Sequence, residues 1–254
     1  MDISKNLKPN VFLFTLGLMG IASIVPLIPQ LLALQEAPLP FSVEIIQIIS
    51  VAQSSVLLLL MIWLGSVFSK KVGLTSPVIF ALARSENAVK ELKPQIIPAL
   101  IGGIVGGVFI LVFLGALTSY LPAEFLSAGE KLIPPWYTKM LYGGITEELL
   151  IRWGLMSFFV WTAYRITQKN GSEIRSHNYI FAIIASALIF GLGHLPVAFA
   201  LSPEVTAPLV AYIILGNAAF GFIAGYLFWK RGLECAIGAH MIAHLTMIIG
   251  VSFA

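Results

Sequence analysis

Six ionisable side chains lie inside stretches of this chain that are otherwise apolar enough to cross a lipid bilayer. They are Glu147, Glu148, Arg152, His194, His240 and His244. A charged side chain at the bilayer centre costs at least ~2.5–3.5 kcal/mol by insertion scales, so such residues indicate a functional site by default. Carboxylates and imidazoles in one protein are the groups that transfer protons in hydrolysis or that bind metal ions.

The two glutamates and the arginine share one apolar segment with a pair of glycines, Gly143 and Gly144. Glu148 and Arg152 are four residues apart, so they meet on one face of a helix and are expected to form an ion pair. Glu147 points about 100° away from Glu148. It faces the side of the glycines, where missing side chains leave room for a water molecule or a substrate backbone. We therefore predict that Glu147 is a general base, although all three groups could instead simply hold helices together.

The three histidines lie on two further apolar segments. His194 is followed by Pro196, whose ring blocks the helical hydrogen bond to the carbonyl of Leu192. Taken alone, His194 could equally be a satisfied interhelical hydrogen-bonding group. His240 and His244 lie one helical turn apart, the spacing that presents two imidazoles to a metal ion or to an oxyanion. The soluble metalloprotease signature H-E-x-x-H is absent.

The composition indicates a multi-pass integral membrane protein with an all-α fold. Hydrophobic residues make up 58% of the 254 residues and charged residues only 11%, whereas a soluble domain has about 25% charged residues. We expect one membrane domain, residues 1–254, built as a polytopic helix bundle. A helix needs about 20 apolar residues to span the bilayer. Seven segments meet this length: 11–34, 43–69, 96–120, 137–164, 179–200, 207–229 and 233–253.

Small residues and prolines predict details of these spans. Glycines that recur on one face predict close helix packing; they are Gly102, Gly103, Gly106 and Gly107 on the third span and Gly216, Gly221 and Gly225 on the sixth. Pro26 and Pro29 are expected to kink the first span.

Basic residues predict the orientation and the partners. Lys and Arg concentrate in the segment before residue 11 and in the connections 70–95, 165–178 and 230–231. Because basic connections stay in the cytoplasm, this pattern places the N-terminus in the cytoplasm and the C-terminus outside. We expect the plasma (inner) membrane, with lipid as a partner. The formal net charge of +3 is scattered among connections and predicts no nucleic-acid partner. One cysteine, Cys235, excludes an internal disulfide framework and a cysteine-based zinc site.

Three motifs in order give the chain a family resemblance. Glu147-Glu148-x-x-x-Arg152, then Phe190-x-x-x-His194, then His240-x-x-x-His244 resembles the CPBP (CAAX protease and bacteriocin-processing, or Abi) family, which includes type II CAAX prenyl endopeptidases. The resemblance covers roughly residues 130–250. It implies a bundle of about seven membrane helices around a hydrophilic cavity. It also implies cleavage of peptide bonds in membrane-associated proteins or peptides.

The resemblance further implies roles for the site residues. Glu147 and His194 would activate the attacking water, while His240 and the residue one turn on would stabilise the oxyanion. That residue is usually Asn or Asp in the family and is His244 here. Three imidazoles and a carboxylate would also suit zinc, so a zinc enzyme and a metal-free glutamate protease both remain open, with the resemblance favouring the metal-free one.

Two other functions remain open from the sequence. A proton-coupled transporter also places Glu, His and Arg near the bilayer midplane, and a non-catalytic member could bind a partner protein, as bacteriocin immunity requires.

The depths of the site residues in the membrane fit together poorly. Counted from the cytoplasmic ends at ~1.5 Å per residue, Glu147 and His194 lie at roughly 22–26 Å but His240 at about 10 Å.

Overall fold

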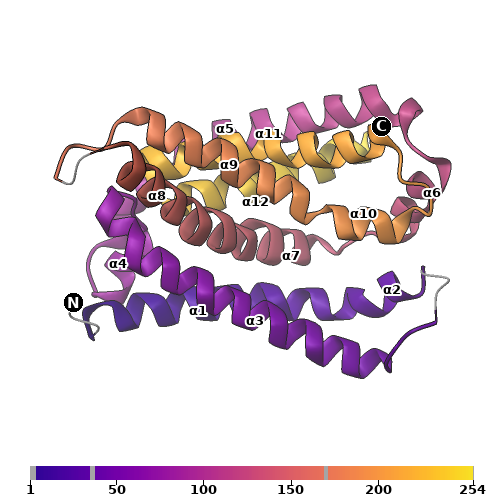
Figure 1. The fold of residues 1–254 in the computed structure, drawn as a ribbon, viewed down its shortest axis with the longest axis horizontal. Coiled ribbons are helices and arrows are strands. Elements are labelled where there is room, and N and C mark those ends of the chain that lie inside the picture. Colours follow the sequence, from indigo (N-terminus) through magenta and orange to yellow (C-terminus); the bar gives the residue numbers. More distant parts are fainter. Residues whose placement is uncertain (1–3, 35–37, 169–170, 254) are drawn as a thin grey trace.

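The computed structural model describes residues 4–34, 38–168 and 171–253, and in these ranges it contains helices and no strand (Figure 1). This confirms the prediction of an all-α protein. The long helices are α1 (Ser4–Ile24), α3 (Val43–Phe68), α5 (Ala88–Leu117), α9 (Ser176–Gly193), α11 (Ala207–Arg231) and α12 (Leu233–Ser252). The shorter elements are η1 (Val25–Leu27), α2 (Ile28–Leu32), η2 (Ser69–Val72), α4 (Pro77–Ala83), η3 (Thr118–Tyr120), α6 (Ala123–Lys131), α7 (Trp136–Thr138), η4 (Lys139–Glu147), η5 (Leu149–Met156), α8 (Ser157–Thr167) and α10 (Leu195–Leu201).

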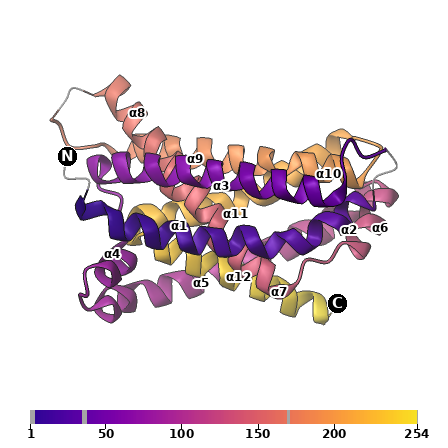
Figure 2. The same cartoon turned by 90° about the horizontal axis from the view of Figure 1, so that it is seen from below.

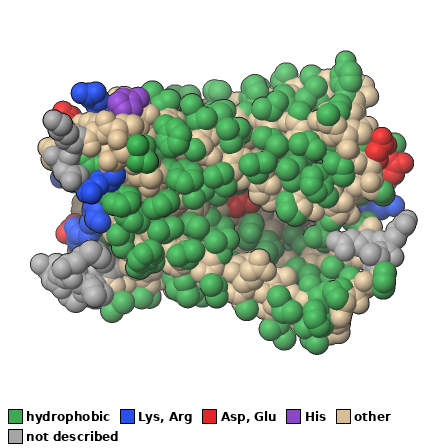
Figure 3. All heavy atoms as spheres, viewed as in Figure 1, with side chains coloured by type: hydrophobic (Ala, Val, Ile, Leu, Met, Phe, Trp, Pro, Cys, Tyr) green, Lys and Arg blue, Asp and Glu red, His purple; other side chains and the backbone are tan. Residues whose placement is uncertain are grey.

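The chain is an integral membrane protein with six helices in its described part that are long and apolar enough to cross a bilayer. Large apolar side chains cover the outside of the bundle, and charged side chains gather at its two ends (Figure 3). Exposed apolar surface on this scale is stable only against lipid. The helices lie roughly parallel along one axis, and α1 begins and α12 ends at opposite ends of the bundle (Figures 1 and 2).

The seventh expected span, 137–164, is not among these six helices. In the structure these residues belong to a helical run from Trp136 to Thr167 that contains two π-helical segments, η4 and η5. Wide helical turns of this kind often accompany functional sites. The count of seven is therefore not confirmed, although the run extends along the bundle beside α9.

Glycines set the distances between the long helices, as their pattern predicted. A Cβ added to Gly103 would lie 2.6 Å from the carbonyl oxygen of Ala239 on α12. A Cβ on Gly221 would lie 2.8 Å from the Cβ of Ala187 on α9. Gly216 differs, because a Cβ there would meet only the Phe113 ring, at 3.5 Å. The α5–α12 and α9–α11 pairs are thus close backbone contacts, whereas a Cβ at Gly216 would make only an ordinary contact.

The first turn of α12 is buried inside the end of the bundle. Gly232 precedes it with φ 110°, a backbone conformation that favours glycine. The N–H of Leu233 donates to the carbonyl of Thr75, at 3.0 Å. Glu234 Oε1 accepts hydrogen bonds from Ser76 Oγ at 2.6 Å and from the N–H of Ile79 at 2.8 Å. The segment that contains α4 therefore covers the start of α12.

Candidate active site

Glu147 and His194 face one another across a gap that one water molecule can bridge. The distance from Glu147 Oε1 to His194 Nε2 is 3.7 Å, slightly too long for a direct hydrogen bond. The side chain of His194 is 34% exposed and that of Glu147 is 16% exposed. Both groups can therefore reach water, and the structure brings together the two residues that the sequence assigned to water activation.

The local sequence around His194 fixes the orientation of its ring. The helix ends at Gly193, and the N–H of His194 donates to the carbonyl of Gly191 at 3.1 Å. The carbonyl of Phe190, which would have accepted that N–H in a regular α-helix, instead lies 2.8 Å from His194 Nδ1. A carbonyl oxygen only accepts, so Nδ1 carries the proton. In the neutral ring, Nε2 is then a free acceptor aimed toward Glu147.

Glu148 connects the arginine to the second histidine. Its Oε2 lies 3.2 Å from Arg152 Nε, and both side chains have no exposed surface, so the expected ion pair is present. Its Oε1 lies 2.8 Å from His240 Nδ1, a contact that the sequence did not predict. Arg152 is itself held by a hydrogen bond to the carbonyl of Gly221, at 3.4 Å. Glu148 thus orients the His240 ring through a buried chain of charged groups.

His240 is bracketed by the two adjacent glutamates. Glu147 Oε2 lies 4.0 Å from His240 Nε2, and Glu148 Oε1 lies 2.8 Å from Nδ1. Two adjacent residues of one helical run thus both lie beside the same imidazole ring. Residues 139–156 form the wide turns of η4 and η5, in which consecutive side chains diverge by a smaller angle than in an α-helix.

The two glycines before Glu147 serve helix packing rather than water. A Cβ on Gly143 would lie 2.5 Å from His244 Nε2, and a Cβ on Gly144 would lie 2.5 Å from Met241 Cγ. The space that we expected to hold water or a substrate backbone is therefore filled by side chains of α12. The ring of His244 stacks on that of His240 with centroids 4.8 Å apart.

The imidazoles and carboxylates do not converge on a metal position. Among the residues that the structure describes, no group of three or more His, Cys, Asp or Glu side chains is arranged to hold a metal ion. The His244 ring lies against Gly143, and Nδ1 of His240 contacts Glu148 Oε1. These donors do not fit the tetrahedral zinc site that the sequence left open.

A cavity of about 460 Å³ opens from the Glu147–His194 pair to the outside of the bundle. Its walls are α3, the η4–η5 run, α9 and α10, and Tyr142 is the additional polar side chain in its lining. Figure 3 shows an acidic side chain at the bottom of a hollow in the middle of the apolar face. The Glu147–His194 pair is therefore reached from the apolar outer face of the bundle.

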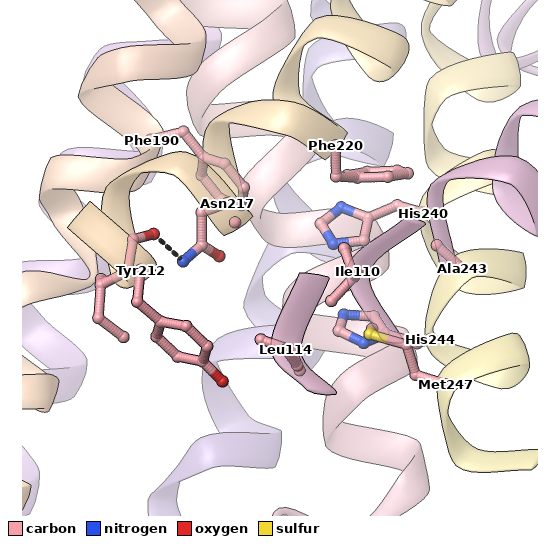
Figure 4. Close-up of a pocket in the computed structure, with 12 residues that line it drawn as sticks. Ile110, Leu114, Phe190, Tyr212, Asn217, Phe220, His240, Ala243, His244 and Met247 are labelled. Atoms are coloured by element: carbon pink, nitrogen blue, oxygen red, sulfur yellow. Dashed lines mark hydrogen bonds between the residues drawn. The ribbon is translucent and has the colours of Figure 1, made fainter. Parts of the chain in front are cut away.

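A second cavity, of about 200 Å³, lies on the other side of His240 between α5, α11 and α12 (Figure 4). His240 and His244 form one wall, and Asn217 and Tyr212 from α11 lie opposite them (Figure 4). Phe190 lines both this cavity and the first one. The His240 ring thus lies between two cavities, with Phe190 at their boundary.

Comparison with known proteins gives a family match for part of the chain. Residues 129–246 match the family described as Type II CAAX prenyl endopeptidase Rce1-like. No curated protein and no solved structure matches the chain.

The Rce1-like region contains all six candidate residues and the wide turns that carry the glutamates. The family resemblance inferred from the three motifs is therefore confirmed, while the role of each residue stays a prediction. The sequence interpretation missed Tyr142, Tyr212 and Asn217, which line the two cavities. Asn217 carried a usable signal, because an amide inside an apolar span is itself unusual.

The depth mismatch between His240 and the other Rce1-like site residues disappears in the structure. His240 was counted from the start of α12, which we had placed at the membrane surface. That start is instead covered by residues 75–79, and Leu233, Cys235 and Ala236 have no exposed surface. His240 Nε2 lies 4.0 Å from Glu147 Oε2, so the site residues of the two helices meet at one level of the bundle.

Proposed function

We propose that this chain is an intramembrane endopeptidase, which hydrolyses peptide bonds of membrane-associated proteins or peptides. The observation that carries the proposal is the Glu147–His194 pair, two acceptor groups 3.7 Å apart in a cavity that opens on the lipid-facing side. Membership of residues 129–246 in a family of prenyl endopeptidases supports the same reaction class.

In the proposed mechanism Glu147 and His194 activate one water molecule. The water donates one hydrogen bond to a Glu147 oxygen and one to His194 Nε2, which leaves a lone pair of its oxygen directed at the substrate. The water oxygen then bonds to the scissile carbonyl carbon, and its proton passes to Glu147. General base catalysis by a positioned side chain contributes typically ~10²–10⁴-fold to the rate.

The proposed role of His240 is to stabilise the oxyanion. Addition of water moves the electron pair of the carbonyl bond onto oxygen, and a donor near that oxygen lowers the barrier. His240 donates to the oxyanion from a protonated Nε2, while Glu148 Oε1, 2.8 Å from Nδ1, holds the ring in place. His244, stacked beside His240, offers a second ring nitrogen to the same oxygen.

The cycle ends when the carbon–nitrogen bond breaks. The oxyanion electron pair re-forms the carbonyl, the leaving nitrogen takes the proton from Glu147, and the products are a carboxylic acid and a free amine. Every step uses groups that face the cavities around His240. We further propose that the chain lies in the plasma (inner) membrane with its N-terminus in the cytoplasm, as the basic connections predict.

Mapping of new peptide N-termini in membranes tests the proposed function. Membranes from cells producing the wild-type chain or Glu147→Gln at equal levels are compared by mass spectrometry. We expect a set of new N-termini, inside or next to apolar segments, that is present only with the wild type. Identical sets from both samples would contradict the proposal. Glu130→Gln, a carboxylate on the exposed helix α6, serves as the matched control and should give the wild-type set.

A further inference from the structure

A third cavity, of about 300 Å³, lies at the end of the bundle that contains α4. It is bordered by η2, α4 and the first turn of α5. Among the described residues, it shares no lining residue with the two cavities around His240. Ligand pockets in proteins measure about 300–1,000 Å³, so this cavity has the size for one small polar group.

Two cations in the cavity wall lie over the same aromatic ring. Lys70 Nζ is 5.5 Å from the centre of the Phe80 ring, and Arg84 Cζ is 5.6 Å from it. Like charges this close repel each other, and an anion between them would relieve the repulsion. A guanidinium presents its donors in the geometry that suits phosphate oxygens.

Two carboxylates line the same cavity. They belong to Glu86 and Glu91. Within the part of the chain that the structure describes, neither forms an ion pair with Arg84. A cavity that keeps its cation and its carboxylates apart suits a ligand that carries both charges, since a simple anion would be repelled by the carboxylates.

One hydroxyl in the cavity wall gives independent evidence for a polar ligand. Ser69 lines the cavity and has no exposed surface, and its Oγ makes no hydrogen bond to the residues that the structure describes. Ser76 in the same wall differs, because its Oγ donates to Glu234 Oε1 at 2.6 Å. Buried polar atoms are nearly always satisfied, so the Ser69 hydroxyl indicates a bound polar group.

The cavity lies where two membrane-spanning helices end. One apolar span ends at Val72 and the next begins at Ala88, and all the lining residues fall within 69–91. Basic side chains are visible at this end of the bundle (Figures 1 and 3). Large apolar side chains in α4 and the first turns of α5 are exposed; they are Leu82, Val89 and Leu92. Charged walls next to exposed apolar side chains suit a lipid headgroup and its acyl chains.

We propose that this cavity binds the headgroup of a phospholipid that carries both a phosphate and a primary ammonium group, as phosphatidylethanolamine does. Arg84 binds the phosphate oxygens, and Lys70 adds positive charge beside it. Glu86 and Glu91 accept hydrogen bonds from the ammonium group. The acyl chains run over the exposed apolar side chains of α4 and α5.

Native mass spectrometry of the detergent-purified full chain measures the lipid preference. The protein is incubated with an equimolar mixture of phosphatidylethanolamine, phosphatidylcholine and phosphatidylglycerol that have the same acyl chains. We expect phosphatidylethanolamine to be retained most. The choline group has no N–H to donate to a carboxylate, and the glycerol headgroup carries no cation. Equal retention of the three lipids, or a preference for either of the other two, would overturn the proposal.

Two substitutions test the two halves of the site. Arg84→Gln should lower the retention of phosphatidylethanolamine by roughly 2–5-fold, the range expected for loss of one partly exposed ion pair. Glu91→Gln should lower it by a similar factor and leave the retention of phosphatidylglycerol unchanged. Arg175→Gln and Glu173→Gln are the matched controls, because both side chains are exposed in the connection before α9 and do not line the cavity. Equal retention in all four variants would overturn the proposal.

Glycerophosphoethanolamine separates a lipid from a water-soluble phosphoester, because it has the same headgroup without acyl chains. A ligand that binds only the folded state raises the unfolding temperature. At equal concentrations phosphatidylethanolamine should raise that temperature more than glycerophosphoethanolamine does, and more in the wild type than in Arg84→Gln. An equal rise with the soluble compound would overturn the assignment to lipid. These measurements need no peptidase activity, so their outcome is independent of the proposed function.

Discussion

His240 lies between two carboxylates that have different surroundings. Glu148 and Arg152 have no exposed surface, whereas Glu147 is 16% exposed and borders the open cavity. A carboxylate sealed against an arginine cannot exchange protons with a substrate, so we propose that Glu148 positions the ring. The carboxylate that reaches the cavity is the one available for proton transfer.

Glu148→Gln should destabilise the protein more than Glu147→Gln does. The substitution leaves Arg152 as an unpaired charge in the interior, and breaking a buried pair in this way costs about 3–5 kcal/mol. Thermal unfolding of the detergent-purified variants provides the measurement. If Glu148→Gln unfolds at the wild-type temperature but is inactive while Glu147→Gln is active, the two roles are exchanged.

His244→Asn should retain substantial activity. An amide also donates a hydrogen bond, so a role limited to the oxyanion survives the change, whereas a zinc ligand would be lost. Elemental analysis of active protein should find less than about a tenth of an equivalent of zinc, because the described donors do not converge. Activity that disappears in His244→Asn, and chelator inhibition that zinc reverses, would contradict this expectation.

The residue types of the site could be predicted from the sequence, but not all of their contacts. Ionisable groups in apolar segments are visible in one sequence because their cost does not depend on the fold. The contact from Glu148 to His240 joins residues 92 positions apart, so it depends on how two helices pack. The cavity lining by Asn217 and Tyr212 depends on the same packing.

Helix α9 and the π-helical run place their side chains by departing from regular α-helix. The end of α9 at Gly193 frees the Phe190 carbonyl for the His194 ring, a break that Pro196 indicated in the sequence. The wide turns of η4 and η5 had no comparable signal in the residues. For this reason the sequence indicated the break beside His194 but not the wide turns that carry the glutamates.

The close approach of α5 to α12 should depend on single glycines. Gly103→Ala places a Cβ 2.6 Å from the carbonyl oxygen of Ala239, and overpacking of this kind typically costs about 1–3 kcal/mol. We expect a lower unfolding temperature for Gly103→Ala than for Gly115→Ala, the same change on the same helix with nothing within 4 Å. Equal unfolding temperatures would show that α12 does not depend on this contact.

The Glu147–His194 cavity opens on the apolar outer face of the molecule, and the charged residues gather at its two ends (Figure 3). The membrane class and the helical fold followed from composition alone, because both depend on the solvent rather than on particular contacts. The depth of α12 could not be counted from the sequence, since the segment around α4 covers its first turn.

The orientation in the membrane can be tested by labelling single cysteines after replacement of Cys235. Arg175, exposed in the connection before α9, should react as cysteine only from the cytoplasmic side. Lys131, exposed at the end of α6, should react as cysteine only from outside. The neighbouring residues 169–170 lie outside the described part of the chain. Reversed labelling at both positions would overturn the positive-inside assignment.

The most direct measurement is the rate at which purified Glu147→Gln cleaves a peptide that the wild type cleaves. Glutamine keeps the size of the side chain but cannot accept the proton of the attacking water. The account predicts a loss of at least ~10²–10⁴-fold in kcat, with an unfolding temperature close to that of the wild type. Cleavage by Glu147→Gln at the wild-type rate would contradict it.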